Sequence, residues 1–431
     1  MAFDAVKPVA VRGGTVVDHA GSRRADVLVE KGRIVEVSDL AHVPGKAVVL
    51  DASGCLVSPG FVDLHSHLRE PGREEAETVE SGSRAAALGG YTAVVAMPNT
   101  EPAIDSAAVV RQVQELGRSA LCDVAVAGAI TVGRSGKQLA PLGEMAALGV
   151  RLFTDDGRGV QDGRLMRRAL EYARALGVTL AQHCEDEALA AGGSMHEGAV
   201  SSRLGIPGQP SEAEELMVMR DIALCRLTGT PMHFLHLSTA GSVAMVAGAK
   251  AAGLPVTAEA TSHHFTLTDE TVESFDPVFK VHPPLRTEAD VAAVREGLSD
   301  GSIDAIATDH APHAAEAKEQ AFDDAAPGML GLETALALGL TELDLVPERV
   351  VALLSWQPAQ IAGLADHGRP VSEGQPANLT VFDPSETWVV DRDRLASRSR
   401  NTPYAGRKLT GKVRHTIHRG EPVVIDQEAQ R

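Results

Sequence analysis

Two histidines spaced two residues apart, His65 and His67, stand at the end of an apolar run from Leu56 to Leu64. In a β-strand, residues i and i+2 point to the same face, so both imidazoles would project from one side of that run. Two imidazoles on one face make half of a metal site, because borderline-soft divalent ions such as zinc favour nitrogen ligands. The other half must come from more distant parts of the chain.

Further residues of ligand type follow other apolar runs, namely Asp156, His183, His236 and Asp309. Four imidazoles and two carboxylates are the number and kind needed for two divalent ions that share a bridging group. His65, His67 and Asp309 could hold one ion. His183 and His236 could hold the other, which leaves Asp156 to bridge the two. Since a metal lowers the pKa of bound water toward about 7, a hydroxide held between the ions would be a nucleophile at neutral pH. The set therefore predicts a metal-dependent hydrolase.

Nearby histidines and one cysteine have a structural interpretation. An isolated histidine in a strand is more often a hydrogen-bonded core residue than a ligand, whereas the set above places six ligand-type residues at the ends of five strands. His233 should face away from the site. His263 and His264 fit packing or the support of a ligand. Cys184 directly follows His183, so strand alternation turns it to the opposite face.

Short apolar, β-branched runs alternate with longer stretches of helical pattern between residues 56 and 340. We predict strands at 57–64, 92–97, 123–130, 150–153, 178–182, 232–235, 254–258 and 303–308. Glycines such as Gly177 and Gly253 close the helical stretches just before some of these runs. Eight β-then-α units predict an α/β fold of the (β/α)8 TIM-barrel type. Each candidate ligand lies at or just past the end of a run, where such barrels carry their active sites.

Both ends of the chain have the pattern of β-structure outside the barrel. Short alternating pieces joined by turns occupy residues 6–55, and segments 378–383 and 413–417 have the same character. The two flanks predict a small composite β-sandwich built from both chain ends. The expected domains are residues 1–55 and 366–431 for the sandwich and 56–365 for the metal-dependent barrel. Residues 311–327 follow a candidate ligand and could form a lid over the barrel mouth.

Composition limits the classes of partner and the compartment. The chain of 431 residues has 58 acidic against 40 basic side chains and a formal net charge of −18, which disfavours binding to nucleic acid or anionic lipid. No apolar run approaches the roughly 20 residues of a membrane span, and the N-terminus lacks a basic segment leading into an apolar one. The four cysteines form no CxxC pair, so neither a thiolate zinc site nor a disulfide framework is predicted. We therefore expect a cytoplasmic protein that binds neither nucleic acid nor membrane.

Several segments together resemble class I dihydroorotases of the amidohydrolase superfamily. They are DLHSHLREPG at 63–72, MPNT at 97–100, FTDDG at 153–157 and TDHAPH at 308–313. The resemblance extends through GLET at 331–334 to NTPYAGRKLTGKV at 401–413, so it covers nearly the whole chain. It implies the reversible interconversion of dihydroorotate and N-carbamoyl-aspartate, a step of de novo pyrimidine (UMP) biosynthesis.

The resemblance also implies roles for the ligand-type residues. Asp309 matches the family's catalytic aspartate, a general acid/base that takes a proton from the attacking hydroxide and delivers it to the leaving nitrogen. Many relatives bridge their metals with a carboxylated lysine at the end of the fourth strand, yet residues 150–156 contain no lysine, so an aspartate must serve. Of the pair there, Asp156 agrees with the family's spacing to His183, and Asp155 is expected to support a turn or a ligand. The implied cofactor is Zn²⁺, one or two ions per subunit, with two preferred.

Residues that match the family's substrate contacts are Arg69, Asn99, His282, His313, Pro327 and Gly328. The resemblance implies that Arg69, Asn99 and His313 hold the substrate carboxylate, a use suited to a guanidinium. It implies backbone contacts from Pro327 and Gly328 to the pyrimidine ring. In the KVHPPLR segment at 280–286, His282 stands where the family usually has asparagine. An asparagine amide carries a donor and an acceptor on one group, whereas a neutral imidazole has them on separate nitrogens of its ring. The contact made there is therefore expected to differ from the family's.

Two other interpretations stay open. Hydantoinases, dihydropyrimidinases and allantoinases open similar cyclic amides on the same scaffold, but the missing lysine and the set of Arg69, Asn99 and His313 favour an acidic substrate. The second is a non-catalytic scaffold for aspartate transcarbamoylase, against which the complete ligand set argues. The expected partners are the small-molecule substrates, with a homodimer and a complex with aspartate transcarbamoylase as open alternatives.

Overall fold

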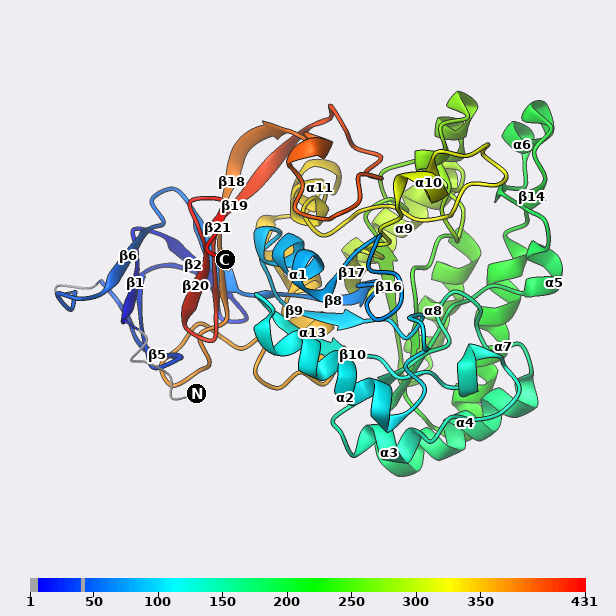
Figure 1. Ribbon diagram of the computed structural model, residues 1–431, viewed down its shortest axis with the longest axis horizontal. Helices are drawn as coiled ribbons and strands as arrows, with labels where there is room; N and C mark the ends of the chain where they lie inside the picture. Colours follow the sequence, from blue (N-terminus) through cyan, green and yellow to red (C-terminus); the bar gives the residue numbers. More distant parts are fainter. Residues whose placement is uncertain (1–6, 40–42) are drawn as a thin grey trace.

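The computed structural model describes residues 7–39 and 43–431, which form a barrel with a sandwich of strands beside it (Figure 1). Strands from both chain ends, blue and red in Figure 1, lie together at the left, and the green helices of the barrel lie at the right. The helices of this described part include none that is long and apolar enough to cross a membrane.

The barrel strands of the described residues are β8 (Phe61–Ser66), β9 (Tyr91–Ala96), β10 (Asp123–Val126), β11 (Leu152–Phe153), β12 (Thr179–Gln182), β15 (Met232–Phe234), β16 (Val256–Thr261) and β17 (Ala305–Ala307). Parallel pairing joins β8, β9 and β10, and it runs in chain order from β11 to β17. Parallel bridges between Gly128 and Phe153 and between Ser66 and His310 close the circle. Every predicted run overlaps one of these strands, so the (β/α)8 barrel is confirmed.

Helices follow the barrel strands: α1 (Val79–Leu88), α2 (Ala107–Leu116), α3 (Leu142–Ala146), α4 (Gly163–Leu176), α7 (Glu212–Thr228), α8 (Ala240–Ala251), α9 (Glu288–Asp300) and α11 (Ala335–Glu342). The ends of α4 follow from its sequence. Asp162 accepts hydrogen bonds from the backbone N–H groups of Arg164 and Leu165, and Gly177 ends the helix at φ +66°. Shorter elements lie in the loops and after the barrel: α5 (Glu187–Ala190), β13 (Met195–His196), α6 (Ala199–Leu204), β14 (Gly208–Gln209), α10 (Ala315–Lys318), α12 (Pro347–Leu354) and α13 (Trp356–Ile361).

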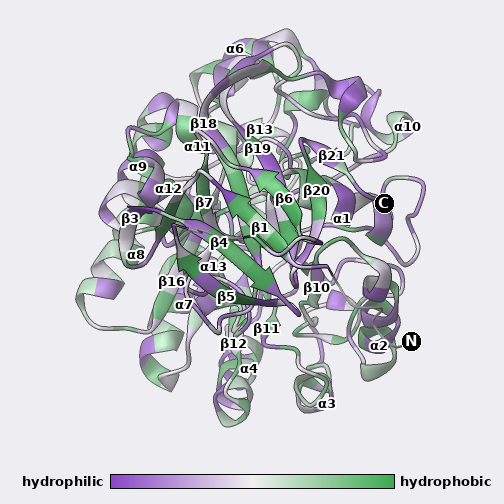
Figure 2. Cartoon of the chain, turned by 90° about the vertical axis from the view of Figure 1, so that its left-hand side faces the viewer, coloured by the Kyte–Doolittle hydropathy of each residue, from purple (hydrophilic) through white to green (hydrophobic). Residues whose placement is uncertain are grey.

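The sandwich consists of two sheets within the described ranges. One sheet contains β1 (Val9–Arg12), β4 (Asp26–Glu30), β5 (Arg33–Ser38) and β6 (Val48–Asp51). The other contains β2 (Thr15–Asp18), β3 (Gly21–Arg24), β7 (Leu56–Pro59), β18 (Leu379–Val389), β19 (Lys408–His418), β20 (Glu421–Ile425) and β21 (Glu428–Ala429). One buried cluster joins Val11 and Val27 of the first sheet to Leu379 and Ile417 of the second. Figure 2, which faces this side, shows β1 and β4 largely in the hydrophobic colour. The composite sandwich is therefore confirmed, with the C-terminal strands all in the second sheet.

Two strand predictions need correction. The run 57–64 is not one strand, because β7 pairs with β18 and β2 in the sandwich while β8 pairs with β9 in the barrel. Gly60 separates the two strands, and a Cβ there would collide with Thr92 of β9. The seventh barrel strand, β16, extends past Ala258 to Thr261. We propose to keep the predicted division at residue 365 and to move the first division from residue 55 to the end of β7, which belongs to the sandwich.

Strands β18 and β19 extend beyond the sandwich and pack beside α11 (Figure 1). The segment between them returns to the barrel, where Asn401 Nδ2 donates to the carbonyls of Ala311 and Gly328 at 2.9 and 3.1 Å. The C-terminal part of the chain therefore fixes the loop after β17, a contact that the sequence pattern did not predict.

Candidate metal centre and substrate pocket

The six predicted ligand-type residues lie together at the carboxyl ends of the barrel strands, and all six are buried: His65, His67, Asp156, His183, His236 and Asp309. Strand β8 carries His65, and His67 follows its end. Asp156 follows β11, and the remaining three follow β12, β15 and β17 within two residues. The carboxyl ends of parallel strands meet at one end of a barrel, which is why residues so far apart in the chain share one pocket.

Asp156 occupies the centre of this cluster. Its Oδ1 lies 3.3 Å from His65 Nε2, 3.5 Å from His183 Nδ1 and 3.7 Å from His236 Nε2. Its Oδ2 lies 3.6 Å from His67 Nε2. Two candidate metal groups result, one with His65 and His67 and one with His183 and His236, and Asp156 belongs to both. This shared position is the one that a bridging carboxylate would occupy.

The separations between these atoms fit a divalent ion. Zinc bonds to nitrogen or oxygen are about 2.0–2.1 Å long, so neighbouring ligand atoms of a tetrahedral site lie about 3.3 Å apart. The distances from Asp156 to the imidazole nitrogens, 3.3 to 3.7 Å, lie near that value. His65 Nε2 is buried, makes no hydrogen bond and faces both Asp156 and Asp309. Donors that converge in this way indicate a metal cofactor.

Both carboxylates of the cluster are ionised. Burial alone would raise the pKa of Asp156, but the charge of His65 and the close imidazoles of His183 and His236 hold that pKa well below its ordinary value. Burial likewise opposes ionisation of Asp309, and the charge of His65 together with His67 Nε2, which lies 2.9 Å from the carboxylate, lowers the pKa of Asp309. Ionised carboxylates are what metal binding and a general base require.

A buried glutamate that the sequence analysis missed orients His65. Glu259 Oε1 lies 2.9 Å from His65 Nδ1, and its Oε2 lies 3.0 Å from His233 Nε2. His233 in turn bonds Thr257 through Nδ1 at 2.8 Å. A carboxylate behind a ligating imidazole fixes its tautomer and leaves the opposite nitrogen for the metal. His233 therefore has the structural role expected of it, and an acidic residue in an otherwise uncharged strand was the available signal for Glu259.

Asn99 and Asp155 support neighbours of the cluster. The Asn99 amide oxygen accepts the hydrogen bond of His67 Nδ1 at 2.9 Å, which leaves its amide NH2 for another partner. Asp155 Oδ1 accepts the backbone N–H groups of Ile130 and Thr131 at 2.8 and 3.0 Å. Asp155 thus shapes the loop beside the site, as expected, and Asp156 alone of the pair faces the imidazoles.

Backbone strain concentrates at this end of the barrel. Arg69, His236 and Asp309 have φ values of +61°, +32° and +43°. Such left-handed conformations cost a residue other than glycine about 1–3 kcal/mol and persist where surrounding contacts enforce them. No sequence pattern reveals this strain, because residue type alone does not fix φ, even though His and Asp adopt positive φ more often than most residues.

Arg69 and His313 form a buried basic pair beside the cluster. Arg69 Nε donates to the Pro312 carbonyl at 3.0 Å, and its Nη2 lies 3.4 Å from His313 Nε2. His313 Nε2 donates to the Pro327 carbonyl at 2.8 Å, and its buried Nδ1 makes no hydrogen bond. Burial lowers the pKa of Arg69 to about 10, so the guanidinium stays charged at neutral pH. A buried cation that donates to a carbonyl and has an imidazole beside it fits a site for an anionic ligand.

The remaining residues predicted to contact substrate are His282, Pro327 and Gly328. They lie in two loops that are hydrogen-bonded to each other. His282 follows Lys280 by two residues, and the Lys280 carbonyl accepts the Gly328 N–H at 2.9 Å. The Gly328 carbonyl accepts from Asn401, and the Pro327 carbonyl accepts the histidine hydrogen bond described above. The backbone groups predicted to contact a ring are therefore bonded within the protein in this structure.

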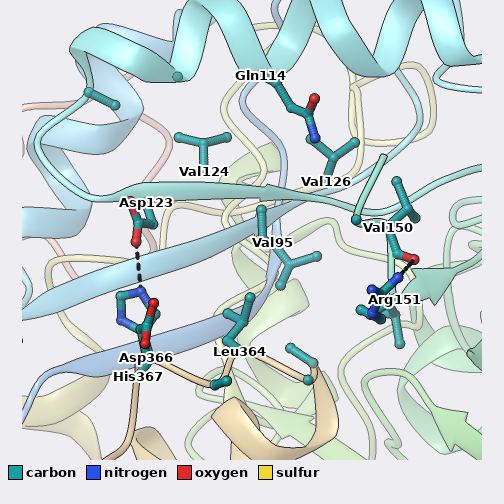
Figure 3. Close-up of a pocket in the computed structure, with 18 of the residues that line it drawn as sticks. Val95, Gln114, Asp123, Val124, Val126, Val150, Arg151, Leu364, Asp366 and His367 are labelled. Carbon is teal, nitrogen blue, oxygen red and sulfur yellow. Dashed lines mark hydrogen bonds and ion pairs between the residues drawn. The ribbon is translucent and has the colours of Figure 1, made fainter. Parts of the chain in front are cut away.

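A cavity of about 520 Å³ lies at the opposite end of the barrel, near the starts of β10 and β11 (Figure 3). Asp123 accepts from His367 Nε2 at 2.8 Å there (Figure 3) and pairs with Arg419 Nη2 at 2.7 Å. His418 Nε2 lies 3.1 Å from the same carboxylate. Over residues 7–39 and 43–431, no candidate metal group includes Asp123. This second cluster joins the sandwich to the barrel.

The chain is similar to dihydroorotases along nearly its whole length. A family model described as dihydro-orotase-like matches residues 54–242. The dihydroorotase of Streptomyces coelicolor is 50% identical over 427 residues, which cover 96% of this chain and 98% of that protein. The dihydroorotase of Mycobacterium tuberculosis is 48% identical over 432 residues, which cover 97% and 98%.

Solved structures share the fold. The L-hydantoinase (dihydropyrimidinase) from Arthrobacter aurescens matches with a TM-score of 0.88 at 26% identity and covers 99% of this chain and 98% of that one. The dihydropyrimidinase from Brevibacillus agri gives a TM-score of 0.84 at 22% identity, covers 98% and 96%, and is evidence for the fold alone. Identity near 50% over almost the full length, on a chain with this metal cluster, assigns the protein to a family. The chain belongs to the dihydroorotase family of the amidohydrolase superfamily.

Proposed function

We propose that this protein is a dihydroorotase, a cyclic amide hydrolase that interconverts dihydroorotate plus water and N-carbamoyl-L-aspartate in pyrimidine biosynthesis. One observation carries the proposal: a charged, buried Arg69 lies beside a cluster of metal-ligand type centred on Asp156. The cluster suits hydrolysis of an amide, and the guanidinium suits a substrate that bears a carboxylate. The similarity to dihydroorotases over 96% of the chain supports both parts.

The cluster residues His65, His67, Asp156, His183, His236 and Asp309 would hold the metal. When bound, divalent ions polarise an amide carbonyl and lower the pKa of water, which supplies the nucleophile. Asp309 accepts the proton of the attacking water at a carboxylate oxygen and passes it to the ring nitrogen as the C–N bond breaks. In the closing direction the same oxygen removes the proton from the ureido nitrogen.

The basic residues orient the substrate. Arg69 and the Asn99 NH2 group bind its carboxylate, and His313 completes that pocket. When these groups hold the carboxylate, the substrate ring is fixed with its amide facing Asp309. The reacting groups are then already oriented before the reaction begins. We further propose ring contacts from His282 and from the backbone at Pro327 and Gly328, which require the present hydrogen bonds of those two residues to rearrange.

We propose zinc as the metal, with two ions per chain, because Asp156 lies within reach of both histidine pairs. A cytoplasmic location, a homodimer and a complex with aspartate transcarbamoylase are further proposals. Size-exclusion chromatography with light scattering, with and without the transcarbamoylase, measures the last two.

A substrate panel tests the assignment. Purified protein loaded with zinc is assayed with dihydroorotate, N-carbamoyl-aspartate, hydantoin, dihydrouracil and allantoin. We expect turnover of the first two only, loss of turnover with a chelator and recovery with Zn²⁺. Equal turnover of dihydrouracil or hydantoin would support the second candidate, a hydantoinase or dihydropyrimidinase, which the structural similarity to the Arthrobacter enzyme favours. Metal binding without turnover of any compound would support a scaffold role.

A further inference from the structure

Lys318 is a buried lysine whose polar contacts are all backbone carbonyls. Its Nζ donates to the carbonyls of Ala326 and Gly328 at 2.9 Å and of Lys280 at 3.1 Å. Only 6% of the residue is exposed. Three carbonyls use all three N–H donors of an ammonium group, so the group is fully satisfied without a carboxylate.

The three carbonyls belong to the two loops that border the basic pocket. Ala326 and Gly328 flank Pro327, whose carbonyl accepts the hydrogen bond of His313 Nε2. Lys280 precedes His282 and also accepts the Gly328 N–H at 2.9 Å. The ammonium of Lys318 therefore ties the loop that orients His313 to the loop that carries His282.

The charge of this ammonium reaches the same pocket. Burial and the charge of Lys280 lower the pKa of Lys318 to about 7. Burial, then the charges of Arg69 and Lys318, lower the pKa of His313 to about 2. A neutral side chain could fill this space without the electrostatic cost of burying a cation. A cation near two other basic groups becomes favourable when an anion binds between the loops.

We propose that Lys318 is a positioning residue for the substrate: its ammonium holds residues 326–328 against the loop of residues 280–282, so that His313 and the positive field of the pocket are preset for a carboxylate. This inference deepens the proposed function and depends on it. Arg69 contacts the carboxylate directly, whereas Lys318 acts through His313 and the backbone at Pro327.

Two variants at this position separate the roles of volume, hydrogen bonds and charge. Lys318→Met keeps the volume and removes the donors, and Lys318→Gln keeps two donors without charge. Lys250→Met is the matched control, because Lys250 Nζ also joins two segments, through Gly301 and Asp304, at the start of β17. KM, kcat, metal content and thermal midpoint are measured for each protein.

We expect Lys318→Met to raise KM for dihydroorotate about tenfold with kcat changed less than about threefold and metal content unchanged. The increase should be larger for N-carbamoyl-aspartate, which has two carboxylates, and smaller in Lys318→Gln. Lys250→Met should change only the thermal midpoint. A Lys318→Met protein with wild-type KM and a lower thermal midpoint, or two Lys318 variants that do not fold, would show that the residue acts on stability alone and would overturn the proposal.

A binding measurement keeps this proposal separate from the proposed function. Orotate, a planar analogue with the same carboxylate, is titrated calorimetrically into wild type and Lys318→Met. If the wild-type protein does not turn over dihydroorotate, the proposed function is contradicted. Even then, a weaker affinity of Lys318→Met than of wild type for orotate supports the role of Lys318. Equal orotate affinities contradict that role even in an active enzyme.

Discussion

The two ends of this barrel each hold a carboxylate in contact with imidazoles, buried in the case of Asp156 and half-buried in the case of Asp123, and the two clusters differ in how their atoms are paired. At the mouth, Asp156 faces four histidines at 3.3 to 3.7 Å. At the foot, the opposite end where β10 and β11 begin, the Asp123 carboxylate pairs with His367, His418 and Arg419 at 2.7 to 3.1 Å. In both clusters the neighbouring groups hold the pKa of the aspartate below its ordinary value against the effect of burial.

The difference shows what marks a metal site. At the foot, Arg419 supplies a permanent positive charge and His367 Nε2 donates to the carboxylate, so Asp123 has its partners within the protein, although His418 Nε2 makes no hydrogen bond there. At the mouth, His65 Nε2 has no hydrogen bond, and Glu259 occupies the other nitrogen of the same ring. Histidines and aspartates in proximity are therefore not sufficient evidence. Nitrogens that converge while a second carboxylate orients them from behind are the informative feature.

The largest effect at the mouth is expected from Asp309→Asn. The amide cannot accept the proton, so kcat should fall by about 10²–10⁴-fold while most of the metal remains bound. Turnover of dihydroorotate and metal content by mass spectrometry check this. Asp304→Asn, at the other end of β17, serves as the control and should keep kcat within about twofold. Retention of kcat by Asp309→Asn would remove Asp309 from the mechanism.

Glu259→Gln tests the cluster at the mouth, because it removes the charge of the carboxylate that bonds His65 Nδ1. We expect zinc affinity to fall by about 10–100-fold, with kcat recovered at saturating zinc. Competition with a chromogenic chelator measures the affinity. The control is Glu333→Gln, since Glu333 is a carboxylate outside the metal cluster whose pKa burial raises to about 7. Unchanged zinc affinity in Glu259→Gln would show that the buried glutamate does not tune the site.

Asp123→Asn tests the foot of the barrel. Removing the charge leaves His367 and Arg419 without their ionic partner, so stability should fall by about 1–3 kcal/mol. Zinc content and kcat should stay at wild-type values, because this cluster serves the junction between sandwich and barrel. Denaturant unfolding and the dihydroorotate assay measure both. Asp366→Asn, an exposed residue of the same cavity, should change stability by less than about 0.5 kcal/mol. Loss of zinc from Asp123→Asn would contradict the separation of the two ends.

The smallest expected effect is the pH dependence of the difference in unfolding free energy between wild type and Asp123→Asn. The folded pKa of Asp123 lies below its ordinary value, so its contribution is present above about pH 3.9 and is lost as pH falls through the folded pKa. The difference between wild type and Asp123→Asn should therefore persist at pH 5 and shrink below about pH 4. A difference that grows in acid would reverse the sign assigned to this carboxylate.

The sequence was sufficient for the barrel and for the set of ligand-type residues. Polar residues such as His65 and His183 interrupt β-branched runs where strands end, and parallel strands bring those ends together. The division between β7 and β8 was missed because both are apolar, although Pro59 and Gly60, a pair typical of turns, separate them in the sequence. The partners of β7 in the sandwich lie far along the chain, so its pairing could not be predicted.

Contacts between distant segments account for what the sequence analysis missed. Glu259 was missed because the predicted strand ended at Ala258, one residue too early. Asn401 and Lys318 act on backbone carbonyls of other loops, and such bonds leave no periodic pattern in the chain. The same holds for the strained backbone of Asp309, which follows from its surroundings.

The metal content of wild type and Asp156→Asn after zinc reconstitution tests the central claim most directly. Wild type should bind close to two zinc ions per chain, because Asp156 lies within reach of both histidine pairs. Asp156→Asn should bind less than one, since the shared ligand is lost from both groups. Full zinc binding by Asp156→Asn, or no zinc bound by wild type, would contradict the account.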